Sequence, residues 1–162
     1  MSTITPANAI NITIDDTYGD SETGAVPIYS PVNAWDGADC MKCAIQPDAS
    51  KAHDGSWYAA TYNKGMESLN ISFSFEGTAL YVYFILANDE GVGITTTTAV
   101  TFTLDGVPDG DFTHIPLDAE GLQYNELVYA RTGLNQEWHD FLISTSGFPG
   151  DDFVNFDYAL YT

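Results

Sequence analysis

Short segments of alternating apolar and polar residues constrain the fold of this chain more than any other feature. Across residues 69–75, Leu, Ile, Phe and Phe occupy every second position, and Asn and Ser fill the positions between them. Successive side chains of a β-strand point to opposite faces of the sheet, so this pattern predicts a strand with one buried face. Apolar residues at helical spacing are hard to find along the chain. The sequence therefore favours an all-β fold.

Turn-forming residues separate this strand from its neighbours. The Glu-Gly-Thr sequence at 76–78 leads into the almost continuously apolar run 79–86, and the two segments together predict a β-hairpin. A second hairpin is predicted around the Asp-Gly pairs at 105–106 and 109–110. The remaining predicted strands cover residues 10–14, 100–104, 112–115, 122–129, 138–144 and 153–161. Seven or eight short strands bounded by turns are typical of an antiparallel β-sandwich or jelly roll.

The charge balance excludes several classes of partner. The 162 residues include 23 Asp and Glu against 4 Lys and Arg, which gives a formal net charge of -19. Proteins that bind nucleic acid cluster Lys and Arg against the phosphates, and the basic residues of this chain are spread apart. Anionic membrane surfaces are excluded as partners for the same reason. The composition indicates a ligand that is neutral or cationic.

The length predicts a single β-sandwich domain over residues 1–162, because chains of this size can bury about two thirds of their unfolded surface. The irregular region 17–65 is rich in Pro, Asp, Gly and Ala, and it contains both cysteines and two of the three Trp residues. Long loops in compact domains are often functional, so we expect a binding site there. The chain has no run of about eighteen apolar residues, which indicates no direct membrane insertion.

Cys40 and Cys43 form a C-x-x-C pair with three candidate roles. A redox dithiol needs a stabilised thiolate, and the nearby Asp36 and Asp39 would raise rather than lower a thiol pKa. A zinc site needs two further ligands, and the chain has no other Cys and only three scattered His. The pattern favours a short structural disulfide formed in an oxidising compartment. Because an extended chain holds these Cα atoms about 10 Å apart, the disulfide requires a turn between them.

The most distinctive segment is Lys-Ala-His-Asp-Gly-Ser-Trp at residues 51–57. It is an Asp-Gly turn followed by an aromatic residue, and the turn carbonyls can converge with the Asp54 carboxylate on one point. Ca²⁺ binds such mixtures of carboxylate and backbone oxygens. The alternative is an ordinary turn in which Asp54 bonds to its own backbone. No acidic cluster has the EF-hand spacing, so a helix-loop-helix Ca²⁺ site is excluded.

Motifs for nucleophilic catalysis and nucleotide binding are absent from the sequence. It contains no G-x-S-x-G, P-loop, G-x-G-x-x-G or H-E-x-x-H motif, and His53, His114 and His139 are widely spaced. His139 follows Trp138 in a strand pattern, which indicates a structural role. Two carboxylates that face each other across a cleft would allow glycoside hydrolysis, and their separation depends on the fold. We expect no enzyme activity and keep a glycoside hydrolase as a remote alternative.

Large aromatic residues in loops and at strand ends are the candidate ligand platforms. An exposed ring lowers solubility unless it is covered or used in binding. Sugars stack their C–H faces on such rings, while carboxylates and amides bind the sugar hydroxyls. The predicted ligand-binding residues are Trp35, Asp54, Trp57, Tyr58, Tyr62 and Trp138. The alternative is that two or three of these rings plug the ends of the sandwich.

Several segments resemble the ectodomain of a large set of fungal surface proteins, mostly from mushroom-forming fungi. They are residues 14–17, the Cys40 and Cys43 pair, and residues 48–57, 75–83, 102–106 and 155–161. The resemblance covers the chain from about residue 10 to its end. In that set the domain usually follows a signal peptide and often precedes a membrane span. The resemblance implies secretion or a place at the cell surface, a galactose-binding-like jelly roll and no enzyme activity.

A second resemblance links residues 51–55 and 156–161 to the discoidin-like and related carbohydrate-binding modules. In those modules the Asp-Gly loop and an acidic residue opening the last strand jointly hold a structural Ca²⁺. The resemblance implies Asp54 and Asp157 as the side-chain ligands of a Ca²⁺ ion in this chain.

These observations lead to one expected function and one alternative. We expect a non-catalytic, lectin-like extracellular domain that binds a glycan or cell-wall polysaccharide through loop aromatics. The alternative is an interaction or sensor ectodomain whose acidic surface binds a basic protein partner.

Overall fold

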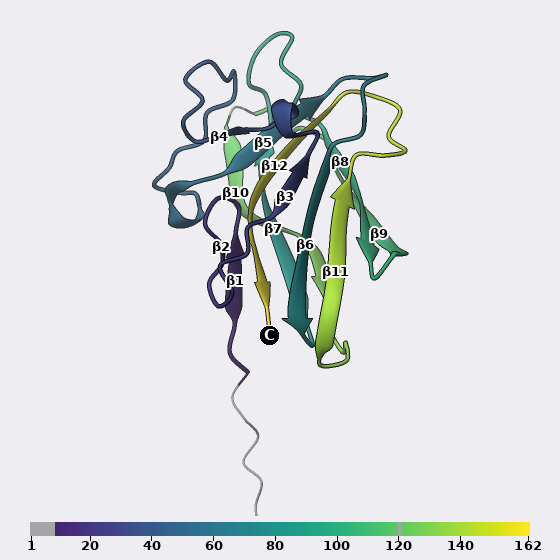
Figure 1. The fold of residues 1–162 in the computed structure, drawn as a ribbon. Coiled ribbons are helices and arrows are strands. Elements are labelled where there is room, and N and C mark those ends of the chain that lie inside the picture. The colour runs from purple at the N-terminus through teal and green to yellow at the C-terminus, as the bar shows by residue number, and fades with distance from the viewer. Residues whose placement is uncertain (1–8, 120) are drawn as a thin grey trace, which may run out of the picture.

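The computed structural model describes residues 9–119 and 121–162, and these form two antiparallel β-sheets packed face to face (Figure 1). The seven-stranded sheet has the order β10 (Leu122–Arg131), β7 (Leu80–Ala87), β12 (Asp152–Tyr161), β1 (Ile12–Asp15) and β2 (Gly19–Asp20), with β5 (Tyr58–Tyr62) beside β12 and β4 (Asp36–Gly37) beside β5. The five-stranded sheet has the order β3 (Ile28–Ser30), β6 (Asn70–Gly77), β11 (Glu137–Ser144), β8 (Thr98–Leu104) and β9 (Val107–His114). Two short 3₁₀ turns, η1 (Val32–Ala34) and η2 (His53–Gly55), lie in the loops. The predicted all-β sandwich is confirmed.

None of the helices in the described part of the chain is long and apolar enough to cross a membrane.

The turn at 76–78 joins the two sheets, so the predicted hairpin between its flanking strands is wrong. β6 belongs to the five-stranded sheet and β7 to the seven-stranded sheet. At the crossing, the Thr78 N–H donates to the Thr162 carbonyl, and a Cβ on Gly77 would lie 2.5 Å from the same oxygen. The hydrophobic pattern shows that each strand buries one face, but it does not identify the neighbouring strand.

The second predicted hairpin, β8–β9, is confirmed with a tighter turn than expected. Leu104 pairs directly with Val107, and the two residues between them, Asp105 and Gly106, have φ angles of 52° and 75°. Positive φ at both positions is what a two-residue hairpin turn of the type I′ class requires. β9 therefore begins at Val107, and the predicted turn at 109–110 lies inside this strand.

Four strands lie in the region that the sequence predicted as loop. Three of them, β2, β3 and β4, have two or three residues each. The fourth, β5, pairs with β12 from Tyr62 opposite Asp152 to Tyr58 opposite Phe156. Its sequence Tyr-Ala-Ala-Thr-Tyr has no alternating pattern, so its strand conformation depends on the pairing with β12.

Aromatic rings from both sheets meet in the core. Phe73 of β6 stacks on Phe156 of β12 with ring centroids 6.1 Å apart, and Tyr129 of β10 contacts Phe141 of β11 at 4.6 Å. The largest rings that are no more than 1% exposed are Phe75, Phe84, Phe102, Phe141 and Phe156. These contacts hold the two sheets against each other, because each buried ring removes a large apolar area from water.

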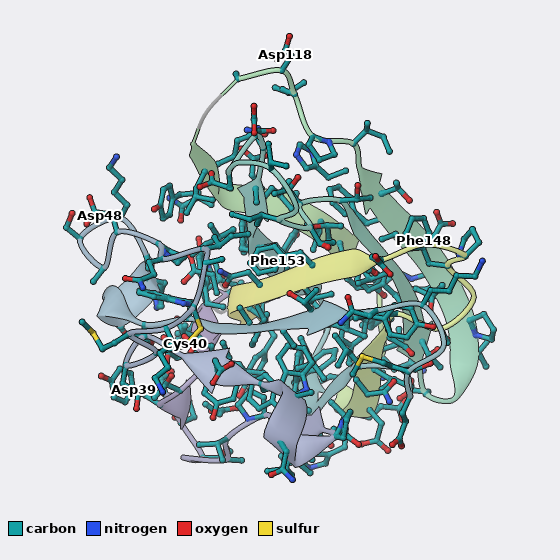
Figure 2. The ribbon with its side chains drawn as sticks, turned by 90° about the horizontal axis from the view of Figure 1, so that it is seen from above. Asp39, Cys40, Asp48, Asp118, Phe148 and Phe153 are labelled. Carbon is teal, nitrogen blue, oxygen red and sulfur yellow. A yellow bond between two sulfur atoms is a disulfide. The ribbon has the colours of Figure 1, made fainter. Side chains whose placement is uncertain are left out.

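The loop region covers one end of the outer face of the seven-stranded sheet. Trp57 packs against Ile85 of β7, and Ile45 packs against Phe153 of β12. Seen from above, Phe153 lies near the centre of this end and Asp48 lies at its rim (Figure 2). The outer face of the sheet therefore carries two smaller apolar clusters beneath the loops.

The core contacts predict the cost of removing a ring. Phe156 is fully buried and contacts the rings of Phe73 and Phe84. We expect Phe156→Ala to lower the free energy of unfolding by about 3–5 kcal/mol, because the lost ring leaves a cavity. Urea titration at neutral pH measures this loss. Val92→Ala is the control, since Val92 is fully exposed and its truncation should change stability by less than about 0.5 kcal/mol. A loss below about 1 kcal/mol for Phe156→Ala would contradict the described core.

Candidate functional site

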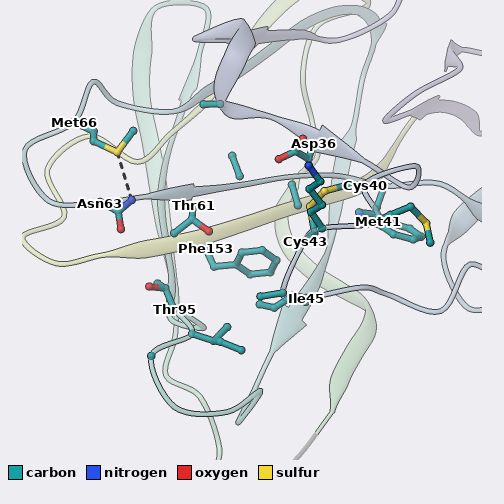
Figure 3. A pocket seen from close by; sticks show the side chains of 18 residues that line it. Asp36, Cys40, Met41, Cys43, Ile45, Thr61, Asn63, Met66, Thr95 and Phe153 are labelled. Carbon is teal, nitrogen blue, oxygen red and sulfur yellow. Dashed lines mark hydrogen bonds between the residues drawn. A yellow bond between two sulfur atoms is a disulfide. The ribbon is translucent and has the colours of Figure 1, made fainter.

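Two hollows in the described structure are large enough to hold a ligand. The larger has a volume of about 890 Å³ and lies between β5, the segment 40–45 and residues 93–95 (Figure 3). The smaller, of about 560 Å³, lies over β6, β11 and β8 beside residues 20–28. Both volumes fall in the range of about 300–1,000 Å³ that is common for small-molecule sites.

The predicted disulfide forms one wall of the larger hollow. The sulfur atoms of Cys40 and Cys43 are 2.04 Å apart and their Cα atoms are 5.6 Å apart. The required turn is present, since the Cα separation is far below the roughly 10 Å of an extended chain and residues 41–42 form a turn. The disulfide lies beside Asp36, and the side chains of Phe153 and other apolar residues line the floor (Figure 3). The hollow is mainly apolar.

Trp35 and Trp57, which the sequence placed on exposed loops, are buried. Trp35 is 6% exposed and its ring centroid lies 5.1 Å from that of Tyr29 in the main core. Trp57 is 7% exposed under the loop that covers Ile85. Tyr58 is half-buried and packs against the main core. These rings are buried because β4 and β5 fold the loop region back onto the sheet, although Trp57 still contributes to the lining of the larger hollow.

Tyr62 lies at the end of β5 and also packs against the main core. It therefore shares the environment of Tyr58 rather than that of a surface platform. Four of the predicted aromatic residues therefore match the alternative that rings fill the sandwich: Trp35, Trp57, Tyr58 and Tyr62.

Trp138, in contrast, reaches solvent. Trp138 exposes 60% of its surface to solvent. Side chains alternate along β11, so that His139 and Phe141 point into the core while Trp138, Asp140 and Leu142 point outward. Trp138 borders the smaller hollow. Of the six predicted ligand-binding residues, Trp138 thus combines a ring with an exposed position.

Small polar side chains lie beside this ring, in a hollow whose lining is otherwise mainly apolar. We call the surface made by Ser72, Ser74, Thr103, Trp138, Asp140 and Leu142 the Trp138 face. Ser74 lies opposite Asp140 across the β6–β11 pair, and its hydroxyl donates to the Asp140 carboxylate at 2.6 Å. Leu142 lies opposite Ser72 on one side and Thr103 on the other. The face therefore offers hydroxyls and a carboxylate around a short apolar centre.

Exposed apolar residues of the β2–β3 segment form one wall of the smaller hollow. Val26 and Ile28 are 57% and 68% exposed. Ile28 also pairs with Ser72 through β3 and β6, which sets this wall directly against the floor.

The buried His139 side chain links two connections between strands: the β8–β9 turn, through Asp105, and the β10–β11 connection, through Asn135. Its Nδ1 lies 2.7 Å from an Asp105 carboxylate oxygen, and its Nε2 lies 3.0 Å from the Asn135 carbonyl. Two oxygen acceptors suit a protonated imidazolium, in which both nitrogens donate. Burial alone would lower the pKa of His139, but the hydrogen bonds to Asp105 and Asn135 raise it overall. The bond from His139 in turn holds the pKa of Asp105 below its usual range. The structural role expected of His139 is confirmed.

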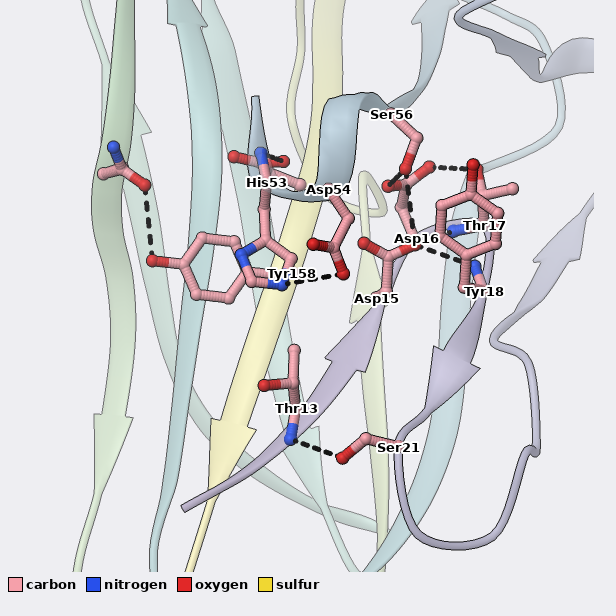
Figure 4. A network of polar contacts seen from close by, with 12 residues as sticks. Thr13, Asp15, Asp16, Thr17, Tyr18, Ser21, His53, Asp54, Ser56 and Tyr158 are labelled. Atoms are coloured by element: carbon pink, nitrogen blue, oxygen red, sulfur yellow. Dashed lines mark hydrogen bonds and ion pairs between the residues drawn. The ribbon is translucent and has the colours of Figure 1, made fainter. Parts of the chain in front are cut away.

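Three buried carboxylates gather where β1 ends beside β12. Asp15, Asp16 and Asp157 are 2%, 1% and 0% exposed. The Asp16 N–H donates to the Asp157 carbonyl at 3.2 Å, which places β1 and β12 side by side here. Ser56 follows the η2 turn, and its hydroxyl donates to Asp16 at 2.8 Å (Figure 4). The Asp157 side chain accepts the His53 N–H through its Oδ1 atom at 2.9 Å. The predicted Asp54 loop and the predicted Asp157 therefore meet in the fold.

Two oxygens of this cluster have no hydrogen-bond partner among the described residues. They are the buried Oδ2 atoms of Asp15 and Asp157. Burial, with a smaller contribution from neighbouring carboxylates, raises the pKa of Asp16 to about 7 and that of Asp157 to about 6. Buried carboxylates without partners are costly, and the cost falls when they are protonated or bind a cation.

The exposed Asp54 completes the cluster at the surface. Ligand atoms of Asp15, His53 and Asp54 lie within 4.8 Å of one another, and the Asp15 carboxylate is turned toward Asp54 (Figure 4). Carboxylate oxygens from Asp15, Asp54 and Asp157 are the donors that a hard divalent cation such as Ca²⁺ prefers. Asp15 and Asp54 thus converge as a hard cation requires, and Asp157 contacts the same turn through the His53 N–H at 2.9 Å.

Asp15 and Asp16 were not among the predicted ligands. The sequence carries a signal for them, because two acidic residues directly follow the predicted strand at 10–14. Acidic pairs at strand ends usually face solvent, and only the packing of β1 against β12 and the η2 turn buries these two.

No family model and no curated protein matches this sequence. Solved structures do share its fold. The catalytic domain of Agl-KA gives a TM-score of 0.54 over 93% of this chain and 27% of that chain, at 10% identity. An exo-β-1,3-galactanase from Phanerochaete chrysosporium, solved with β-1,3-galactotriose, gives 0.50 over 94% of this chain and 29% of that chain, at 14% identity. This chain thus spans less than a third of either protein.

A third similar structure belongs to a protein of about the same length as this chain. The carbohydrate-binding module TmCBM61, solved with β-1,4-galactotriose, gives a TM-score of 0.48 over 83% of this chain and 87% of that chain, at 10% identity.

A further buried carboxylate, Asp152, lies at the start of β12 and away from the acidic cluster. It is fully buried. Its Oδ1 accepts the Ala99 N–H at 2.8 Å, and its Oδ2 has no partner. Burial raises the pKa of Asp152 to about 7. The Asp152 carboxylate therefore binds a proton more tightly in the folded protein than in the unfolded chain.

This pKa predicts how stability changes with pH. A raised carboxyl pKa favours folding below the unfolded value of about 3.9, and the contribution is lost as the pH rises through about 7. We expect Asp152→Asn to remove part of the fall in unfolding free energy between about pH 4 and pH 8, with its relative gain largest at pH 8. Urea titrations across this range measure the slope. The exposed Asp118→Asn is the matched control, and equal slopes for wild type and Asp152→Asn would contradict the prediction.

Proposed function

We propose that this chain is a non-catalytic carbohydrate-recognition domain that binds a glycan on the Trp138 face. One observation carries the proposal: the indole of Trp138 is exposed beside a hollow whose lining includes Ser and Thr hydroxyls and the Asp140 carboxylate. A sugar ring has a C–H face that stacks on an indole and hydroxyls that bond to such polar groups. The face supplies both kinds of contact within one hollow.

The exposure of Trp138 has no explanation in the packing of the sandwich. The two other Trp residues, Trp35 and Trp57, are buried in apolar clusters. Trp138 points away from the core, and the neighbouring positions on its strand supply the buried side chains. A large ring left in water beside a hollow is the arrangement expected of a binding platform.

The structural neighbours support a glycan as the ligand class. The fold occurs in a catalytic domain and in a galactanase whose structure contains β-1,3-galactotriose. A recognition role agrees with the lack of motifs for nucleophilic catalysis in the sequence. The glycoside hydrolase alternative makes the opposite prediction, since it requires that incubation with a bound polysaccharide releases reducing sugar.

We also infer that the domain works outside the cell. The Cys40–Cys43 disulfide is a bond that forms and persists in oxidising compartments. The resemblance to fungal surface ectodomains supports the same location, and a glycan of a cell wall is then within reach.

We further propose that Asp15, Asp54 and Asp157 hold a structural Ca²⁺. The unpartnered oxygens of Asp15 and Asp157 support this proposal. A bound Ca²⁺ supplies the positive charge that lets these carboxylates stay ionised while buried. It would also tie the η2 turn to the ends of β1 and β12, because its ligands come from all three elements.

The proposed stacking predicts a loss of binding when the ring is removed. We expect Trp138→Ala to weaken glycan affinity by at least about tenfold, since buried Trp contacts at binding sites often contribute more than about 1.4 kcal/mol. Calorimetric titration with the best ligand from a glycan array measures this. Trp138→Tyr should retain most of the affinity. Leu127→Ala, at an exposed position on the other sheet, is the control. Unchanged affinity in Trp138→Ala would remove the face as the site.

The Ca²⁺ proposal predicts a change in thermal stability on chelation. We expect chelator to lower the melting temperature by about 5–10 °C and excess Ca²⁺ to restore it, because a ligand at about 100 times its Kd stabilises the folded state by about 2.7 kcal/mol. Asp15→Asn and Asp157→Asn should abolish the response to Ca²⁺. The exposed Asp48→Asn should keep it. An identical melting temperature with chelator and with Ca²⁺ would rule the ion out.

A further inference from the structure

We infer that the Trp138 face selects a cationic glycan, one built from sugars with free amino groups such as a β-1,4-linked glucosamine polymer. This inference rests on the proposed function and specifies the class of sugar that the same face takes. It follows from the charges that surround the indole rather than from the indole itself.

Two carboxylates flank the Trp138 ring. Glu76 lies directly opposite Trp138 across the β6–β11 pair, where side chains on the same face have Cβ atoms about 4.5–5.5 Å apart. Asp140 lies two residues further along β11, so it shares the outward face. Both acidic residues are exposed. A group stacked on the indole is therefore near a carboxylate on each side.

Neither of these carboxylates has a cationic partner in the described structure. The ion pairs found there join Asp54, Asp105 and Asp109 to other residues, and none includes Glu76 or Asp140. The basic residues lie elsewhere: Arg131 pairs with Asp109, Lys51 lies over the Tyr124 ring, Lys42 borders the larger hollow, and Lys64 follows β5. The negative charge beside Trp138 is thus left for a ligand.

A third carboxylate near the face, Asp105, is already compensated. One of its oxygens faces the imidazole of His139, and the other accepts the Asp140 N–H at 2.9 Å. Asp140 itself accepts one hydrogen bond from the Ser74 hydroxyl through Oδ1. Its second oxygen has no hydrogen-bond donor among the described residues and can bind a ligand group.

An ammonium group suits this arrangement better than a neutral or anionic group does. It gains attraction to the indole face and to both carboxylates. A uronic acid or sulfated sugar would instead meet uncompensated negative charge on a protein whose net charge is -19. The hydroxyls of Ser72, Ser74 and Thr103 favour a sugar over a lysine side chain, because they can bond to the hydroxyls of a sugar ring.

Three matched hexamers test this selection. Hexamers of β-1,4-linked glucosamine, N-acetylglucosamine and glucose share one backbone and differ in the substituent at C2. We expect the glucosamine hexamer to bind at least about tenfold more tightly than the other two in calorimetric titrations at low salt. The preference should shrink at high salt, because screening weakens exposed charge pairs. Hexalysine provides ammonium groups without a sugar ring.

Two variants connect the preference to the flanking carboxylates. Glu76→Gln and Asp140→Asn should each weaken binding of the glucosamine hexamer by about two- to fivefold, the range of an exposed ion pair. Glu76→Gln should not weaken binding of the glucose hexamer, because Glu76 is not part of the lining of the smaller hollow. Asp118→Asn changes an exposed carboxylate outside the lining of the smaller hollow; it is the matched control and should alter neither affinity.

The outcomes separate this inference from the proposed function. If all three hexamers bind equally and Trp138→Ala abolishes binding, the selection for amino groups is overturned and the proposed function stands. If no hexamer and no glycan on an array binds, both are overturned. If hexalysine binds as tightly as the glucosamine hexamer, the face recognises a basic protein segment, and the inference is likewise overturned.

Discussion

The pairing of β12 is the constraint on which the rest of the structure depends. This strand hydrogen-bonds to β1, β5 and β7, so it lies inside the seven-stranded sheet. One of its faces places Phe156 in the main core, and the other places Phe153 beneath the loops and Asp157 in the acidic cluster. A shift of β12 by one residue would exchange these faces. Core packing, loop closure and the acidic cluster are therefore specified together by one register.

Aspartates in this protein have opposite roles that depend on their burial. Asp15 and Asp157 are enclosed by β1, β12 and the η2 turn, so their charge is costly without a cation or a proton. Asp140 stands in water on the outer face of β11, where a charge costs little and remains available to a ligand. The net charge of -19 is thus divided between a small buried group, proposed to bind Ca²⁺, and a larger exposed group that governs what approaches the surface.

Much of the fold could be predicted from local pattern. Residues that alternate with period two became β6, β8 and β11 close to the expected bounds, because alternation directly reflects one buried face. The strand β12 also formed close to its expected bounds, although both of its faces are buried. The pattern failed where pairing was non-local. It assigned β6 and β7 to one hairpin although they lie in different sheets, and it missed β5, whose conformation depends on β12. Strand partners are set by contacts between distant residues, and a local pattern carries no information about them.

The sequence by itself determined the fold class and the short disulfide, and the second resemblance anticipated that the Asp54 loop approaches Asp157. Residue type, spacing and the stated resemblances were enough for these. Only the tertiary structure decided which aromatic rings are covered: Trp35 and Trp57 are buried, and Trp138 is exposed beside Asp140. It also decided that Asp15 joins the acidic cluster. The physical reason is that exposure of a side chain depends on which distant segments pack over it, and the loop region packs over one sheet while leaving the Trp138 face open.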